Sequence, residues 1–387
     1  MAAEHRLRVG VVGCGYWGSK HVRVLCGLNE VAEVALIDGR EARLSALSRA
    51  FPGVRSFRSL KDALPHIDAA VIATPPTTHV ALALEAMAAG KHVLIEKPLA
   101  TSTFAAQRLL HAAAASGVTL MVGHTFEYNA AVLRMRELVR SGELGEVFYL
   151  DSARLNLGLY QSDVNVIMDL APHDVSVINC LLGKPPVAVQ AWASRHAHHQ
   201  FEDVAYLRLF YEDTDLSANI HVSWLDPCKV RRMTVVGSRK MAVYNDLAAD
   251  EPIRIHDKGV TAQSAAADLG QPPMSYRYGD IVAPYVAFDE PLMVQDRHFA
   301  DCVRTGAVPR TDGRNGLAVV QVLECAQWSL ELGRRVSMDE VADDVTLRRT
   351  GGERRTLATG SALPPVQDLP LDDVWLEVPA QLVAQRE

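Results

Sequence analysis

The sequence has no apolar run of the roughly 18 residues that a membrane-spanning helix needs. It shows no signal-peptide pattern before Leu7, where an apolar segment begins, and no basic excess, because its net charge is −7. Its six cysteines include no C-x-x-C spacing. These absences argue against membrane and nucleic-acid partners, and they predict reduced thiols in a cytoplasmic protein.

The composition is that of a globular protein with more than one core. The chain has 387 residues, of which 49% are hydrophobic and 22% charged, so two domains are expected. We expect no metal site, since the His196-Ala197-His198-His199 run precedes a strand-like segment and is typical of a loop.

The first 125 residues alternate short apolar runs with helical stretches. Strands are expected at 7–12, 31–38, 68–74, 91–96 and 118–124, and helices at 17–26, 40–50, 79–89 and 103–115. Runs that are apolar throughout are typical of parallel strands buried on both faces. The pattern predicts an α/β domain over residues 1–125 with a doubly wound parallel sheet.

A different pattern follows Tyr128. Strands are expected from residue 146 and at 187–194, 204–211, 216–224, 230–236 and 241–245, with helices at 130–140, 164–182, 292–305 and 315–332. Strands joined by short polar turns predict an open, mainly antiparallel sheet, so residues 126–340 are expected to form a second α/β domain. Residues 260–274 are expected to form a loop, and residues 341–387 an extended tail.

A G-x-G-x-x-G turn follows the first strand. Gly13 is expected to make the tight turn, Gly15 to let the backbone approach a pyrophosphate, and Gly18 to allow close helix–strand packing. The intervening Tyr16 and Trp17 start the helix, whose free N–H groups favour an anion. This pattern predicts a dinucleotide site formed by these five residues.

Asp38 closes the second strand and Arg40 follows it. An acidic group at this place accepts a hydrogen bond from the ribose 2′-hydroxyl and repels a 2′-phosphate, which favours NAD over NADP. Arg40 could instead receive the phosphate, so NADP stays open as an alternative. Both residues are predicted to bind the cofactor.

Two later loops also lie where the strands of such a sheet end. Thr74, Pro75 and His79 belong to a rigid loop at the end of the strand expected at 68–74, and this loop is expected to form a wall of the nicotinamide pocket. Glu96 and Lys97 end the next strand and are expected beside the same cofactor, since open sheets bind ligands at the carboxyl ends of their strands.

These motifs together resemble one family. The chain is similar to Gfo/Idh/MocA-type oxidoreductases through the glycine turn at 13–18, Ala73-Thr74-Pro75-Pro76, Glu96-Lys97-Pro98-Leu99 and Asp169-Leu170-Ala171-Pro172-His173-Asp174. The resemblance covers about residues 7 to 335 and implies an amino-terminal Rossmann domain and a carboxyl-terminal open-sheet domain. It also implies that Lys97 is the active-site lysine, with Asp169 and His173 matching the family's acidic residue and histidine.

The chemistry of these three residues agrees with that role. A spacing of four places Asp169 and His173 on one helix face, where the carboxylate can orient or charge the imidazole, although Pro172 puts strict helical geometry in question. Oxidation of a secondary alcohol needs a base for the hydroxyl proton. Lys97 is expected to act there, either alone or sharing the proton with His173.

A subgroup signal lies in the 154–158 and 163–165 segments, which resemble family members acting on nucleotide-activated sugars. Arg154 and Asn156 share one face of an extended strand, and Tyr276 and Arg277 offer a ring and a cation to a diphosphate. His124 ends the last strand of the first sheet. These five residues are the predicted substrate-binding set.

The leading interpretation is an NAD-dependent enzyme that moves a hydride at a ring carbon, C3, of a nucleotide sugar. An inositol or free-sugar dehydrogenase and an NAD-retaining glycosidase remain open, and the absence of a basic patch argues against a dinucleotide-binding transcription regulator. A homodimer or homotetramer is expected, because the second sheet has a whole face to bury and the resemblance implies sheet packing between subunits.

Overall fold

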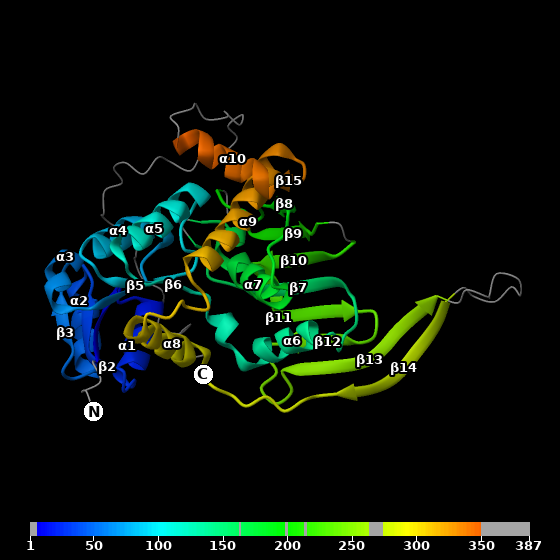
Figure 1. Cartoon of the computed structure of the whole chain (residues 1–387), viewed down its shortest axis with the longest axis horizontal. Helices are drawn as coiled ribbons and strands as arrows, with labels where there is room; N and C mark the ends of the chain where they lie inside the picture. The colour runs from blue at the N-terminus through cyan, green and yellow to red at the C-terminus, as the bar shows by residue number, and fades with distance from the viewer. Residues whose placement is uncertain (1–5, 162–163, 198–199, 213–214, 263–273, 350–387) are drawn as a thin grey trace, which may run out of the picture. The chain divides into compact units, whose positions relative to one another are not determined.

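The structure is a computed structural model that describes residues 6–161, 164–197, 200–212, 215–262 and 274–349. Its first sheet has six strands in the order β3-β2-β1-β4-β5-β6. Figure 1 labels β2, β3, β5 and β6 of this sheet. They are β1 (Leu7–Val12), β2 (Val31–Ile37), β3 (Arg55–Phe57), β4 (Ala69–Ile72), β5 (His92–Glu96) and β6 (Leu120–Gly123). All pairs are parallel, which confirms the predicted doubly wound sheet. The strand order reverses between β1 and β4, where such sheets bind their ligands.

Helices connect these strands. They are α1 (Tyr16–Cys26), α2 (Glu41–Ala50), α3 (Leu60–Ala63), α4 (His79–Ala88) and α5 (Thr103–Ser116), with short 3-10 turns η1 (Leu64–His66) and η2 (Pro76–Thr78). Gly117 ends α5 with φ +64°, a left-handed conformation that glycine adopts without strain.

The second sheet has nine strands in the order β14-β13-β12-β11-β7-β10-β9-β8-β15. They are β7 (Val147–Leu157), β8 (Ala188–Ser194), β9 (Val204–Phe210), β10 (Ser217–Ser223), β11 (Leu225–Gly237), β12 (Met241–Asn245), β13 (Ile253–Ala262), β14 (Met274–Val282) and β15 (Val336–Ser337). Only the β7–β10 pair is parallel among the described strands of this sheet, so the prediction of a mainly antiparallel sheet is confirmed.

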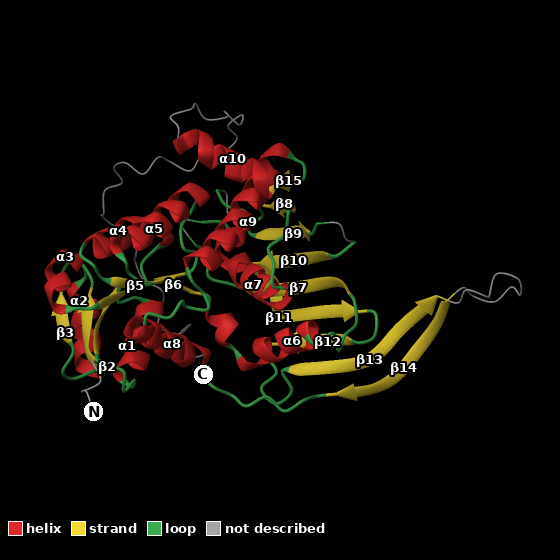
Figure 2. Cartoon of the chain, viewed as in Figure 1, coloured by secondary structure: helices red, strands yellow, loops and turns green. Residues whose placement is uncertain are grey.

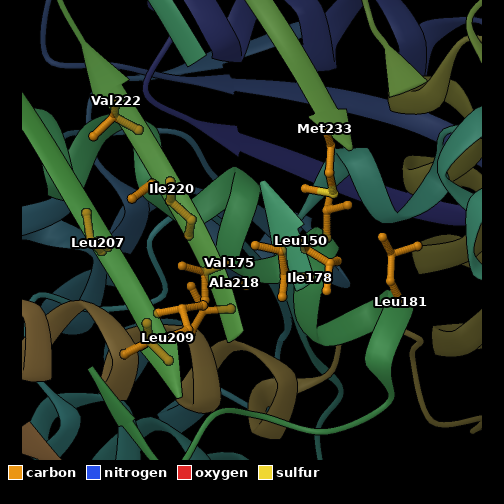
Figure 3. Packing of buried hydrophobic residues seen from close by; sticks show 14 of the residues in the cluster. Leu150, Val175, Ile178, Leu181, Leu207, Leu209, Ala218, Ile220, Val222 and Met233 are labelled. Atoms are coloured by element: carbon orange, nitrogen blue, oxygen red, sulfur yellow. The ribbon is translucent and has the colours of Figure 1, made fainter. Parts of the chain in front are cut away.

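One face of this sheet carries the main core. Helices α6 (Ala130–Arg140), α7 (Val166–Leu182) and α9 (Gly313–Leu332) pack on it. Leu207 and Ile220 point from β9 and β10 toward Val175 and Ile178 of α7 (Figure 3). Alternation along β9 turns Tyr206 to the opposite face, where it is exposed.

The chain returns to the first sheet after the second. Helix α8 (Pro291–Thr305) packs on α1, and its Phe299 is buried in the same cluster as Leu25. Helix α9 contacts α5 and β6 as well as α7 and β8. Because α8 packs on a helix of the first sheet and α9 contacts both sheets, the division into 1–125 and 126–340 stays a prediction about folding units.

Two regions contain strands that the sequence did not predict. β3 was not expected, because it has only three residues and none of them is buried. Within 260–274, expected to be a loop, the ends belong to β13 and β14, and residues 263–273 lie outside the described part. This hairpin extends past the neighbouring strands (Figure 2).

The tail prediction also needs correction at its start. Residues 341–349, expected to be extended, belong to helix α10 (Met338–Arg349), and the rest of the predicted tail lies outside the described residues. Ser337 caps this helix: its Oγ accepts from Glu340 N, and the Glu340 carboxylate accepts from Ser337 N. Val341 anchors this helix, since its side chain is fully buried in the main core on the second sheet. Within the described ranges, no helix combines the length and apolarity needed to span a bilayer.

Candidate active site

The glycine turn joins β1 to α1 and lies against neighbouring backbone. Gly13 has φ +90°, and a Cβ there would come within 2.7 Å of a carbonyl oxygen in the loop after β4. A Cβ on Gly18 would lie 1.8 Å from the Gly13 carbonyl oxygen, so only glycine lets α1 approach this closely. Gly15 is open: the nearest atom to its Cβ would be Arg43 Nη1 at 3.6 Å. The first amides of α1, which have no intrahelical acceptor, border this open space and suit an anionic group.

Two aromatic rings stand at the start of α1, as expected from their place in the turn. Tyr16 is 69% exposed and Trp17 is 38% exposed. Their rings meet edge to face with centroids 5.7 Å apart, and Lys20 Nζ lies 4.7 Å from the Tyr16 centroid. The pair therefore presents an open apolar surface beside the turn.

Asp38 braces the glycine turn. Its Oδ2 accepts from Cys14 N at 2.8 Å, and its Oδ1 accepts from Arg40 N at 2.8 Å. Arg43 Nη1 lies 3.4 Å from Oδ2, so this guanidinium stands between Asp38 and Gly15. Arg40, the predicted competitor for a phosphate, is exposed. Sequence reasoning missed Arg43, although it follows Asp38 by little more than one helical turn.

The loop after β4 is tied to the loop after β5. The buried ring of His79 lies 2.9 Å from the Thr74 carbonyl oxygen through Nε2 and 2.9 Å from the Pro98 carbonyl oxygen through Nδ1. Both ring nitrogens are engaged, so the side chain is not free for the cofactor contact that the sequence predicted. Thr74 and Pro75 keep their predicted place on the loop, and the Lys97–Pro98 peptide is cis.

Glu96 ends β5 with its side chain turned inward. Its Oε1 accepts from His21 Nε2 at 3.0 Å, and its Oε2 accepts from Lys97 N at 3.2 Å. His21 in turn contacts Asp296 of α8. The Glu96 carboxylate is buried, which does not fit the predicted direct contact with a cofactor. It acts on the site through the backbone of Lys97.

Lys97 reaches from the end of β5 to α7. Its Nζ donates to the Asp169 carbonyl oxygen at 2.6 Å and to Asp169 Oδ1 at 3.2 Å. Asp169 Oδ2 accepts from Trp224 Nε1 at 3.0 Å, and Trp224 is almost fully buried. Asn165 caps the start of α7 through Met168 N, which fixes the turn that carries Asp169. Sequence reasoning did not find Trp224, which lies between β10 and β11, because the sequence gives no signal that its indole faces this helix.

His173 lies one turn beyond Asp169 but does not pair with it. α7 runs through Pro172, and the Asp169 carboxylate is engaged by Lys97 and Trp224. The expectation that Asp169 charges His173 is therefore wrong. Burial, together with the charges of Lys97 and Arg154, lowers the pKa of His173 well below its ordinary value. The residue as a whole keeps some accessible surface, but its Nδ1 is buried and has no hydrogen-bond partner among the described residues.

His124 forms the inner wall of the site. It is 1% exposed, and neither ring nitrogen has a hydrogen-bond partner in the described structure. Burial lowers the pKa of His124 to about 4; nearby Glu96 opposes this shift and Lys97 adds to it. The ring is thus a neutral group behind Lys97, and its burial leaves little surface for the predicted substrate contact.

Arg154 is held by the protein itself. Its Nε donates to Asp174 Oδ2 at 2.8 Å, its Nη2 donates to Asp174 Oδ1 at 3.3 Å, and its guanidinium carbon lies 4.6 Å from the Phe126 ring centroid. Phe126 meets the His173 ring edge to face at 5.1 Å. Arg154 therefore supports His173 through Phe126. This corrects the prediction that the Arg154 guanidinium is free to bind substrate. Asn156 lies two residues further along β7 and is partly exposed.

The other predicted substrate residues lie elsewhere. Tyr276 and Arg277 belong to β14, the edge strand of the second sheet, whose nine residues are all exposed. Arg277 pairs with Asp257 on β13 and with the Arg239 carbonyl oxygen. Four strands separate β14 from β10, and Trp224 directly follows β10. The structure thus does not bring Tyr276 and Arg277 to Lys97 in the same chain.

The described residues fit a bound dinucleotide. Gly15 leaves open space beside free amides, Gly13 and Gly18 admit no side chain, and Lys97 stands at the adjoining strand end. No group of three His, Cys, Asp or Glu residues within the described ranges could hold a metal ion.

Two family matches cover the chain on either side of residue 130. Residues 7–124 match GFO_IDH_MocA, described as an oxidoreductase family with an NAD-binding Rossmann fold, and residues 132–243 match the GFO/IDH/MocA C-terminal domain. The chain belongs to the Gfo/Idh/MocA family. The expected resemblance is confirmed, and this Gfo/Idh/MocA protein is an oxidoreductase with an NAD-binding domain.

Named relatives differ in substrate. The chain is 26% identical to D-apiose dehydrogenase from Paraburkholderia graminis over 90% of its length and 95% of the relative. It is 35% identical to UDP-N-acetylglucosamine 3-dehydrogenase from Acidithiobacillus ferrooxidans over 48% of its length and 57% of the relative. The solved structure of GenD2 from gentamicin A biosynthesis, in complex with NAD, has a TM-score of 0.73 and 27% identity, over 86% of this chain and 96% of that one.

Proposed function

We propose that this protein is an NAD-dependent dehydrogenase or ketoreductase that moves a hydride at C3 of a nucleotide-activated sugar. The observation that carries the proposal is the pairing of Lys97 with Asp169 at the end of β5, with His173 one turn further along α7. In this proposal these three residues are catalytic. The cofactor is bound by Gly13, Gly15, Tyr16, Trp17, Gly18, Asp38, Thr74 and Pro75.

The bound nicotinamide would supply the hydride acceptor or donor. Lys97 is the proposed proton carrier for the substrate hydroxyl. Two of its three donor positions point at Asp169, which leaves the third for a substrate oxygen. Asp169 holds the amine in place, and Trp224 holds Asp169.

His173 is the second proposed group at the substrate hydroxyl. Since its pKa is lowered, the ring is neutral near pH 7 and can accept or donate a hydrogen bond. Phe126 and Arg154 fix the ring from the other side. The site therefore offers one amine and one neutral imidazole on the same side of the strand ends.

The choice of a nucleotide sugar is supported by the 35% identity to the UDP-N-acetylglucosamine 3-dehydrogenase. A second candidate, a free-sugar or inositol dehydrogenase, is favoured by the longer alignment with D-apiose dehydrogenase. Tyr276 and Arg277 lie away from Lys97, so within one chain they do not support binding of a substrate diphosphate. The free-sugar or inositol dehydrogenase is therefore tested alongside the proposal.

The deciding experiment compares kcat/KM for UDP-N-acetylglucosamine and its uronic acid with that for myo-inositol and D-apiose. NADH formation is followed with NAD+ in excess. The Lys97→Ala variant is the control that shows how much NADH forms without the proposed active site. Preference for a UDP-sugar supports the proposal, and preference for a free polyol replaces it with the second candidate. Turnover of a glycoside without net NADH would favour the glycosidase alternative.

A homo-oligomer built on the second sheet completes the proposal. On the sheet face opposite α7, Trp192 is 58% and Tyr206 is 47% exposed, and Tyr206 stacks on His221 with ring centroids 4.0 Å apart. An aromatic row on an uncovered sheet face is typical of a protein interface. We infer that a second copy of this chain covers it.

A further inference from the structure

His21 is buried between two carboxylates. Its ring is fully inaccessible, with Nδ1 2.9 Å from Asp296 Oδ2 and 3.1 Å from Oδ1. On the other side, Nε2 lies 3.0 Å from Glu96 Oε1. Both ring nitrogens thus face groups that only accept hydrogen bonds when ionised.

This arrangement requires a charged ring. A neutral imidazole has one N–H and could satisfy only one of the two carboxylates, whereas the imidazolium donates to both. Burial by itself would lower the pKa of His21, but Asp296 and Glu96 outweigh it and raise the pKa to about 10. The three residues therefore form a buried cluster of one cation and two anions.

The cluster joins three segments that are distant in sequence. His21 lies on α1, the helix that starts at the glycine turn, Glu96 ends β5, and Asp296 lies on α8, which packs against α1. Glu96 also accepts from Lys97 N through its other oxygen. A Cβ on Gly123 would come within 3.1 Å of Glu96 Oε1, so the neighbouring strand leaves this carboxylate little room to shift.

We propose that His21 is a positioning residue that fixes Lys97 relative to the glycine turn, acting through Glu96 and held in place by Asp296. This inference rests on the proposed role of Lys97. A dinucleotide bound at the turn is placed by α1, whereas the amine that must meet the substrate is placed by the end of β5. The His21–Glu96 contact is a direct link between these two elements. Misplacement by about 1 Å can cost a reaction about a hundredfold.

Two substitutions of His21 separate its two contacts. In His21→Gln the side-chain amide nitrogen takes the place of Nε2 and keeps the donor to Glu96. In His21→Asn the amide nitrogen takes the place of Nδ1 and keeps the donor to Asp296 only. Both variants lose one donor and the positive charge, so a general loss of stability would affect them alike.

The readout is the rate at which Lys97 is acylated by an amine-reactive reagent, measured by mass spectrometry against the exposed Lys229. In the intact protein the Lys97 side chain is 11% exposed and doubly hydrogen-bonded, so labelling is slow. We expect His21→Asn to raise the rate about tenfold or more, the scale of one lost hydrogen bond to a charged group, while His21→Gln stays near the intact protein. The exposed His111→Asn on α5 is the matched control and should change nothing.

Two outcomes would overturn the proposal. One is equal Lys97 labelling in folded His21→Asn and His21→Gln, and the other is a neutral His21 ring by nitrogen-15 NMR of histidine-labelled protein. If His21→Asn does not fold, Glu96→Gln, which removes one acceptor beside Lys97 N, should raise labelling instead. NADH affinity should stay within about threefold in all variants, less than 1 kcal/mol. Neither labelling nor NMR needs a substrate, so a failed sugar assay would not be mistaken for failure of this inference.

Discussion

Lys97 Nζ lies 2.6 Å from the carbonyl oxygen of Asp169 and 3.2 Å from its carboxylate oxygen Oδ1, so one residue of α7 holds the amine twice. The lysine directly follows β5 of the first sheet, and the aspartate lies in the first turn of α7, which packs on the second sheet. The contact therefore joins the cofactor half of the proposed site to its substrate half. Trp224, which follows the end of β10, donates to the other carboxylate oxygen of Asp169, Oδ2.

Lys97→Ala should lower turnover at least about a hundredfold, the usual scale for loss of an acid–base group. NAD binding should persist, because the glycine turn and Asp38 are untouched. Turnover is measured with the substrate found in the sugar panel, and NAD binding by calorimetry. Lys61→Ala, at an exposed position, is the control. Turnover like that of the intact protein would remove Lys97 from the mechanism.

NAD(H) should bind more tightly than NADP(H). Asp38 stands at the end of β2, where a carboxylate repels the extra 2′-phosphate, and Asp38→Ser should narrow or reverse the preference. Asp38 also accepts from Cys14 N, so the melting temperature of the variant must be measured alongside. Tighter binding of NADPH by the intact protein would show that Arg40 and Arg43 dominate the pocket.

The stability of the protein should fall as pH rises toward neutrality because of Glu127. Burial raises the pKa of Glu127 to about 7 from 4.5, although Asn315 Nδ2 donates to its carboxylate and Arg310 lies nearby. The folded protein thus holds a proton between these values that the unfolded chain releases, and stability declines across that window. Glu127→Gln, which cannot ionise, should flatten the decline in urea unfolding measured from pH 4.5 to 7. The same slope in both proteins would assign it to another group.

The first sheet could be predicted closely because its strands carry their own signal. β1, β4 and β5 are apolar runs buried on both faces, and the structure places them within about two residues of expectation. β14 gave no such signal, since an exposed edge strand has no buried face and hence no alternation. The Ser337–Glu340 spacing is a signal for the start of α10, but residues 341–349 of this helix were predicted to belong to the extended tail.

The site, like the fold, has features that the sequence predicted and features that it could not predict. Spacing along one helix predicted that Asp169 and His173 share a face, and motif position predicted Lys97 at a strand end. Spacing could not tell that Asp169 pairs with Lys97, because that contact depends on how α7 docks beside β5. Trp224 and His21 were missed for the same reason, since each acts on a residue from a different segment of the chain.

The protein should be a dimer or tetramer in solution. The exposed Trp192 and Tyr206 on the uncovered face of the second sheet supply the apolar centre that an interface needs. Light scattering at micromolar concentration should give a multiple of the single-chain mass, and Trp192→Asp should lower it. Tyr285→Asp replaces an aromatic residue that is 91% exposed outside the sheet and serves as the control. The mass of one chain for the intact protein would rule out this interface.

The rate of substrate oxidation, measured against pH, should show no decline on the acid side (no acid limb) near pH 6.5. If His173 shares the hydroxyl proton with Lys97, its neutral form is needed for oxidation. Burial and the charges of Lys97 and Arg154 lower the pKa of His173, so the ring stays neutral at pH 6.5, and oxidation should fall only in more acid solution.

The variants separate His173 from its neighbours. His173→Asn should slow turnover and flatten the acid limb. Asp169→Asn should slow turnover through Lys97 and leave the limb in place, since the carboxylate contacts Lys97 and Trp224 rather than the imidazole. Turnover and kcat/KM are measured from pH 4.5 upward, with melting curves at each pH to exclude unfolding. An acid limb that survives in His173→Asn would belong to another group and leave the histidine a structural role beside Phe126.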